Sequence, residues 1–173
     1  MVAFVFAVVV IAGLAGYIAS RPNSFRMERS IVIAAPPEKI FPLIANFHEW
    51  TKWSPFEKLD TDLKRGYSGP DSGVGAIYTW DGKKAGAGRM EILEAPPSSL
   101  VRIKLDFSKP FTAHNIAEFT IVPQGEGTST VTWAMSGPQP FVVKAMSTVM
   151  STDKIVGPQF EEGLASMKRA AES

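Results

Sequence analysis

The feature that most constrains the fold is a series of short segments between residues 62 and 136 in which apolar and polar residues alternate. Residues 100–107 (LVRIKLDF) place their valine, isoleucine, leucine and phenylalanine on one face and their charged side chains on the other. Successive side chains of a strand point to opposite faces. Turn signals, among them the Asp-Gly pair at 81–82, separate the segments. About six strands of an antiparallel sheet are therefore predicted, with one face packed against a cover.

The segments that flank this region supply the helices of an α+β fold. Residues 30–34 (SIVIA) alternate as a strand does, and the following PPEKIFPLI has the prolines and acidic residue typical of a helix start. Near the C-terminus, four apolar residues recur at helical spacing: Phe160, Leu164, Met167 and Ala171. A helix that carries this stripe is predicted to cover the apolar face of the sheet. Pro158 is expected to divide that helix in two.

The first 20 residues, MVAFVFAVVVIAGLAGYIAS, contain no charged residue and no proline. As a helix they would reach about 30 Å, the thickness of the hydrocarbon core of a bilayer. A single transmembrane anchor is the favoured interpretation. A cleaved signal peptide is the second, with GLA as its cleavage site. A buried core helix is the third, although it should have a polar face.

Residues 21–26 are predicted to form a linker, and residues 27–173 one domain. Three arginines against a single glutamate follow the apolar segment. Since positively charged flanks tend to stay in the cytoplasm, the prediction is a single-pass membrane protein whose domain faces inward. With a net charge of +1 and no basic run interleaved with aromatic residues, nucleic acid is not an expected partner. No oligomeric state is predicted.

Few side chains form a recognisable catalytic or metal-binding pattern. The chain has no cysteine, and its two histidines, His48 and His114, lack the spacing of metal ligands. No Ser-His-acid arrangement is visible. The sequence therefore predicts no catalytic group, no metal and no cofactor.

Two of the four tryptophans lie in the short segment WTKWSPFEKLD, residues 50–60. Residues 31–55 (IVIAAPPEKIFPLIANFHEWTKWSP), which include the start of this segment, resemble the opening of the START-like superfamily. This superfamily is also called the SRPBCC or polyketide cyclase/dehydrase-like group. The segments SGVGAIYTWDG, DFSKPFTAHNIAEFTI and TSTVTWAMSGP resemble later strands of its membrane-anchored bacterial branch. This resemblance implies a helix-grip fold, in which a curved antiparallel sheet wraps around the C-terminal helix and leaves an apolar cavity.

In such a fold the short helices after the first strand lie over one end of the cavity. Their aromatic residues would face inward-pointing residues of the strands and of the C-terminal helix. The predicted ligand-binding residues are Trp50, Trp53, Phe56, Tyr78, Trp80, Phe107, Asn115, Phe119, Trp133 and Phe160. For the aromatic members the alternative is plain core. Asn115 is the polar residue that points inward in mid-sheet. The alternative for its amide is a hydrogen bond to the backbone or to water instead of to a ligand.

Three classes of function are compatible with this sequence. The favoured one is a membrane-tethered module that binds an apolar small molecule, such as a lipid or polyketide-like compound. The alternative is a cyclase/dehydrase-type enzyme that uses the same cavity, for which a buried ionisable residue in the cavity would be the sign. The third is a protein-interaction or co-chaperone-like module, which would need an apolar outer sheet face.

Overall fold

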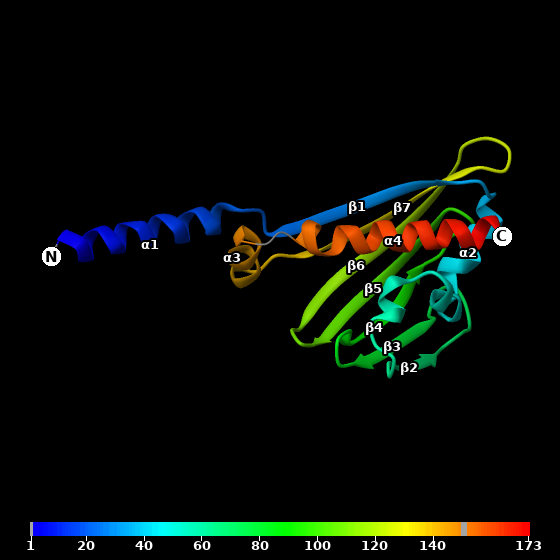
Figure 1. The fold of residues 1–173 in the computed structure, drawn as a ribbon, viewed down its shortest axis with the longest axis horizontal. Coiled ribbons are helices and arrows are strands. Elements are labelled where there is room, and N and C mark those ends of the chain that lie inside the picture. The colour runs from blue at the N-terminus through cyan, green and yellow to red at the C-terminus, as the bar shows by residue number, and fades with distance from the viewer. Residues whose placement is uncertain (1, 150–151) are drawn as a thin grey trace.

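A curved antiparallel sheet holds the C-terminal helix against its inner face in the computed structural model, which describes residues 2–149 and 152–173 (Figure 1). The described strands are β1 (Ser24–Ile33), β2 (Lys64–Ser68), β3 (Ile77–Gly82), β4 (Gly86–Glu94), β5 (Leu100–Lys109), β6 (Ala113–Pro123) and β7 (Ser129–Pro138). They pair in the order β1-β7-β6-β5-β4-β3-β2. The alternation in the sequence thus correctly predicted six antiparallel strands after the first one.

Some of the helices lie on the inner side of the sheet, and others lie beyond the end of the sheet at which β1 begins (Figure 1). They are α1 (Val2–Ser20), α2 (Pro37–Ala45), the 3₁₀ helices η1 (Phe47–Lys52) and η2 (Pro55–Lys58), α3 (Phe141–Val149) and α4 (Thr152–Glu172). Helix α4 runs along the sheet, α2 contacts β5 and β6, and η1 and η2 pack against α4. Helix α1 extends away from the sheet and contacts α3.

The predicted apolar stripe of α4 forms the centre of the core. Phe160, Leu164, Met167 and Ala171 are all at least 97% buried. They face inward-pointing residues of the strands, including Val101, Ile103, Ala117, Phe119, Ile121, Val131 and Trp133. The predicted helix-grip arrangement, an α+β fold, is therefore confirmed.

Helix α4 is continuous through Pro158, so the predicted division of this helix is wrong. Arg29 of β1 clamps the helix on both sides of the proline. Its guanidinium donates to Asp153 at 2.9 Å and to Glu161 at 2.8 Å. Gly157, beside the proline, leaves room for this group, because a Cβ there would lie 2.4 Å from an Arg29 nitrogen. These ion pairs tie the helix to β1 on both sides of the proline.

The prediction of a membrane anchor is also wrong. No helix within residues 2–149 and 152–173 combines the length and the apolar character that a bilayer crossing needs. Helix α1 has 19 residues, and its second half includes Gly13, Gly16 and Ser20. The expected single-pass topology and the cytoplasmic placement of the domain depended on that span, so the same finding contradicts them. Strand β1 begins at Ser24, so the last part of the predicted linker, residues 24–26, belongs to the sheet.

The burial of the α4 stripe predicts the effect of shortening one of its side chains. Leu164→Ala is expected to lower the free energy of unfolding by about 2–5 kcal/mol, because the lost methyl groups leave a void in a packed core. Urea denaturation followed by circular dichroism measures this change. Glu162→Ala, on the exposed face of the same helix, serves as the control and should change stability by no more than about 0.5 kcal/mol. A loss below about 1 kcal/mol for Leu164→Ala would mean that the sheet does not grip α4.

Candidate functional site

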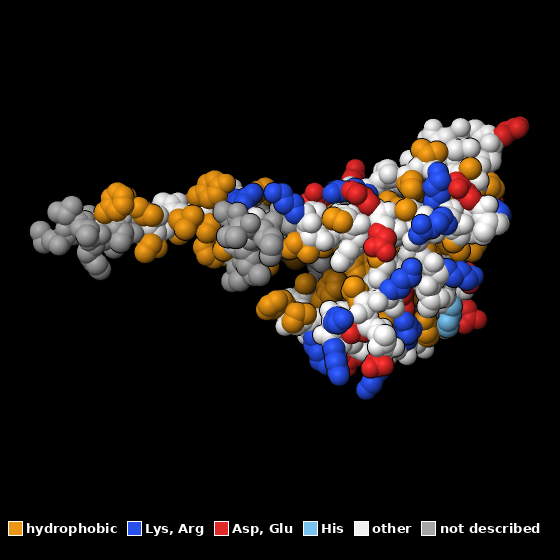
Figure 2. Space-filling view, in the orientation of Figure 1, with side chains coloured by type: hydrophobic (Ala, Val, Ile, Leu, Met, Phe, Trp, Pro, Cys, Tyr) orange, Lys and Arg blue, Asp and Glu red, His pale blue; other side chains and the backbone are white. Residues whose placement is uncertain are grey.

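A cavity of about 280 Å³ lies between the sheet and the N-terminal half of α4. Side chains from η1, η2, five strands and α4 line it, and most of them are apolar. The lining residues are Trp50, Ser54, Phe56, Glu57, Leu59, Leu63, Tyr78, Trp80, Lys84, Ala85, Met90, Leu105, Phe107, Ala117, Trp133, Met135, Val156 and Phe160. In Figure 2, hydrophobic side chains occupy the recess below α4.

The inner wall of the cavity is a stack of aromatic rings. The ring of Phe160 lies parallel to the indole of Trp133, with centroids 3.9 Å apart and an interplanar angle of 7°. Trp133 also stacks on Phe119, with ring centroids 4.9 Å apart. Gly163 permits this arrangement, because a Cβ at that position would lie 2.9 Å from the Trp133 ring and 3.0 Å from Pro55. The missing side chain therefore lets α4 approach the sheet closely enough for the stack to form.

A second glycine positions the outer aromatic residues of the cavity. Trp80 of β3 lies across Gly88 of β4, where a Cβ would be only 2.4 Å from the indole. The indole N–H donates to the carbonyl of Ala85 at 3.2 Å, and Phe107 contacts the ring edge-on at 5.6 Å. The hairpin of β3 and β4 thus fixes this wall of the cavity.

One carboxylate, that of Glu57 in η2, lies among these apolar groups. The residue is 8% exposed and lines the cavity. Arg65 of β2 donates to its Oε2 at 2.6 Å, and the hydroxyl of Tyr78 donates to its Oε1. Burial, reinforced by the hydrogen bond to this carboxylate, raises the pKa of Tyr78 above its usual range. Tyr78 therefore remains a protonated donor, and Glu57 accepts hydrogen bonds from both Tyr78 and Arg65.

The two tryptophans of residues 50–53 have different surroundings. Trp50 lines the cavity and donates its indole N–H to the carbonyl of Ile44 at 2.9 Å. Trp53 does not line it. Its side chain is completely buried, donates to the carbonyl of Leu43 at 2.7 Å and packs edge-on against Phe119 and Trp133. Phe119 is likewise completely buried behind the cavity wall.

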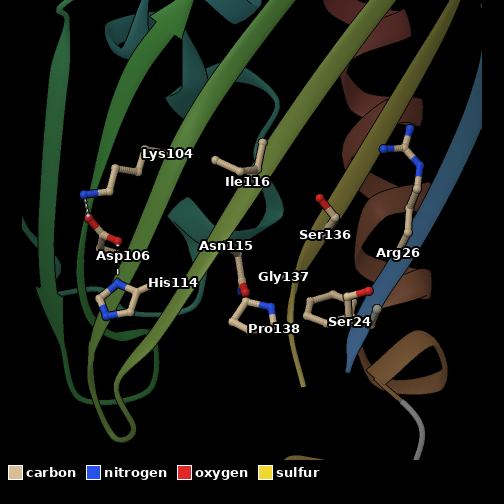
Figure 3. A pocket seen from close by; sticks show the side chains of 11 residues that line it. Ser24, Arg26, Lys104, Asp106, His114, Asn115, Ile116, Ser136, Gly137 and Pro138 are labelled. Carbon is tan, nitrogen blue, oxygen red and sulfur yellow. Dashed lines mark hydrogen bonds and ion pairs between the residues drawn. The ribbon is translucent and has the colours of Figure 1, made fainter. Parts of the chain in front are cut away.

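Asn115 lies outside the cavity, near the start of β6. Its side-chain amide is 4.0 Å from the sulfur of Met135, and its Oδ1 lies against Gly137. It borders a broad, open depression whose other walls come from β1, β5 and β7 (Figure 3). The charged groups there are already paired: Asp106 contacts His114 at 2.7 Å and Lys104 at 3.0 Å. This depression therefore offers no enclosed surface and no unpaired charge cluster for a small ligand.

The sequence matches a family model over residues 24–172, from the first residue of β1 to the last residue of α4. The family is described as polyketide cyclase / dehydrase and lipid transport. The chain belongs to this family. No curated protein matches it in sequence.

Solved structures support the fold of this polyketide cyclase / dehydrase family member. A Chromobacterium violaceum protein of 20% identity superposes with a TM-score of 0.60, covering 88% of this chain and 99% of its own. Norcoclaurine synthase from Thalictrum flavum, in complex with dopamine and hydroxybenzaldehyde, has 15% identity and a TM-score of 0.61, with 86% and 84% covered. The Aha1 dimer from Colwellia psychrerythraea has 20% identity and a TM-score of 0.56, with 86% and 96% covered. At these identities the likeness shows the fold alone.

The family fold brings most of the predicted site residues to one cavity. Those that line it are Trp50, Phe56, Tyr78, Trp80, Phe107, Trp133 and Phe160. Sequence reasoning missed the ionisable group, Glu57, although it lies within the aromatic segment at residues 50–60. No local signal marked it, because Glu57 stands in the first turn of η2, where an acidic residue is ordinarily solvated.

The burial of Trp53 predicts that this residue supports the fold. Trp53→Ala is expected to cost about 3–5 kcal/mol of stability, since it removes a fully buried indole from the centre of an aromatic cluster. Thermal and urea unfolding measure the loss, and Phe111→Ala, at a position 72% exposed, is the control. A nearly unchanged stability together with weaker binding of an apolar probe would instead assign Trp53 to ligand contact.

Proposed function

We propose that this protein binds an apolar small molecule in the cavity between the sheet and α4. The observation that carries the proposal is a cavity of about 280 Å³ whose walls are mostly aromatic and aliphatic side chains. Ligand sites in proteins are typically concave and apolar, with a few polar groups that orient the ligand. The family description, which includes lipid transport, is in accord with this role.

The size of the cavity suggests the size of the ligand. A dry apolar cavity of about 150 Å³ binds benzene, so the larger volume here suits a bicyclic aromatic compound or a short acyl chain. The flat rings of Trp80 and Phe160 favour a planar molecule, which would gain offset-stacked or edge-on contacts with them.

Filling the cavity is expected to abolish binding. Ala117 of β6 is buried and lines the cavity, so Ala117→Phe would place a ring where the ligand is proposed to lie. Affinity for naphthalene, followed by quenching of tryptophan fluorescence, should fall more than about tenfold, equivalent to about 1.4 kcal/mol. Thr120→Phe, on the opposite face of the same strand, is the matched control and should bind naphthalene as the parent does.

Circular dichroism checks that both variants are folded. Leu105→Trp fills the cavity from the neighbouring strand and gives a second test if Ala117→Phe is unstable. Naphthalene binding that persists in folded, cavity-filled variants would show that the ligand site lies elsewhere.

A second candidate function is catalysis of proton transfer in the same cavity. The observation that favours it is Glu57, an ionisable residue that lines the cavity and is held by Arg65 and Tyr78. Its carboxylate is proposed to accept a proton from a carbon next to a carbonyl group, the step that begins many cyclisations and dehydrations. A positioned general base accelerates such a step by about 10²–10⁴-fold.

Hydrogen–deuterium exchange tests this candidate without knowledge of the natural substrate. Acetylnaphthalene in D₂O loses its methyl protons when a base forms the enolate, and proton NMR follows that loss. The parent protein is expected to accelerate exchange over buffer, and Glu57→Gln, which keeps the shape of the side chain, should remove the acceleration. Exchange at the buffer rate with the parent protein, at concentrations where the ketone is bound, would refute proton transfer for this class of compound.

A further inference from the structure

The polar side chains that line the cavity differ in whether they have a partner within the protein. The indole N–H groups of Trp50 and Trp80 donate to backbone carbonyls at 2.9 and 3.2 Å. The hydroxyl of Tyr78 donates to Glu57. The hydroxyl of Ser54 differs from these groups, because it forms no hydrogen bond within the part of the chain that the structure describes.

This hydroxyl is buried, but it is not sealed off from the cavity. Ser54 is 1% exposed and lines the cavity, and its backbone N–H and carbonyl are both hydrogen-bonded, to Trp50 and Glu57. Among the described residues, the one buried side-chain nitrogen or oxygen that has neither a partner nor accessible surface is Nε1 of Trp133. The unbonded Oγ of Ser54 therefore keeps some accessible surface, and the space that this residue borders is the cavity.

The position of Ser54 makes an unbonded hydroxyl unexpected. It is the N-cap residue of η2, where a serine side chain ordinarily accepts a hydrogen bond from the first turn, yet here it makes no such bond. Buried polar groups in proteins nearly always have a partner. We propose that the partner of Ser54 is a neutral hydroxyl group of the ligand, so that the cavity binds alcohols or phenols with an apolar body. This inference rests on the proposed binding function and specifies the chemistry of its ligand.

Glu57, the other polar residue of this segment that lines the cavity, favours a hydroxyl over a carbonyl group. Its amide donates to the Ser54 carbonyl at 3.3 Å, so the two side chains begin one turn apart. Each carboxyl oxygen of Glu57 accepts one hydrogen bond, from Arg65 or from Tyr78, and has room for a second. A ligand hydroxyl can accept a hydrogen bond from Ser54 and donate its own proton to Glu57, whereas a carbonyl can use Ser54 alone.

The charged groups around the cavity favour a neutral ligand over an anion. Lys84, the basic residue that lines it, has an exposed side chain. The guanidinium of Arg65 is engaged by Glu57 at 2.6 Å. A carboxylate or phosphate on the ligand would therefore enter an apolar space without a free buried cation, among the described residues, to pair with.

Two probes of similar shape isolate the hydrogen bond to Ser54. Naphthol carries a hydroxyl group, and methylnaphthalene has a methyl group in its place. The ratio of the two affinities in the parent protein, divided by the ratio in Ser54→Ala, cancels the different hydrophobicity of the probes. We expect this quotient to favour naphthol by about 3- to 10-fold, the usual effect of one neutral hydrogen bond. Ser54→Cys, whose thiol is a weak hydrogen-bonding group, gives the same test if the alanine variant is unstable.

Ser129→Ala is the matched control, because it also removes a buried serine hydroxyl, but one that donates to the carbonyl of Ala35 at 2.9 Å and does not line the cavity. Its ratio of affinities should equal that of the parent protein. Thermal unfolding without ligand gives a second comparison. Ser129→Ala is expected to lower the melting temperature, whereas Ser54→Ala, which loses no hydrogen bond within the protein, should not lower it.

The outcomes separate this inference from the function on which it rests. If neither probe binds, the binding function fails and the inference with it. If both probes bind but the quotient for Ser54→Ala is about one, the cavity binds apolar molecules without using this hydroxyl. That result would overturn the inference, leave the binding function in place and assign the Ser54 hydroxyl to a bound water.

Discussion

The stacking of Phe160 on Trp133 is the contact on which the rest of the structure depends. It joins α4 to the middle of the sheet, and the two sides of this contact differ. Toward the C-terminus, the stripe continues as Leu164 and Met167, and helix and sheet are tightly packed. Toward the N-terminus, Val156 and Phe160 border open space. The cavity is therefore the part of the interface that α4 does not fill.

The elements of the fold were predictable because their signals are local. Alternation over eight to ten residues determines the faces of a strand, and helical spacing determines the stripe of α4. The continuity of α4 was not predictable in this way. The contacts that tie the helix to the sheet on both sides of Pro158 come from Arg29, which lies more than a hundred residues before its ion-pair partners. A proline within a helical pattern gives no indication of such distant support.

The sequence predicted which face of the sheet each site residue occupies, but not whether that residue lines the cavity. Strand parity correctly placed Phe119 and Trp133 on the inner face, yet only Trp133 lines the cavity. Parity also placed Asn115 on that face, but its side chain borders the open depression and not the cavity. Glu57 escaped prediction because a carboxylate at the start of a short helix is ordinarily solvated. Its burial depends on Arg65 and Tyr78, which arrive from two strands that follow later in the chain.

Gly163 affects the width of the cavity although it does not line it. In most helices an alanine in place of glycine is favourable by about 1 kcal/mol. At this position the new methyl group would press against the Trp133 ring and Pro55, so that α4 would have to move outward. Because Phe160 lies one helical turn away, it would move with the helix and widen the space beside Trp133. Position 163 thus sets the distance between α4 and the sheet, and any side chain added there would widen the cavity.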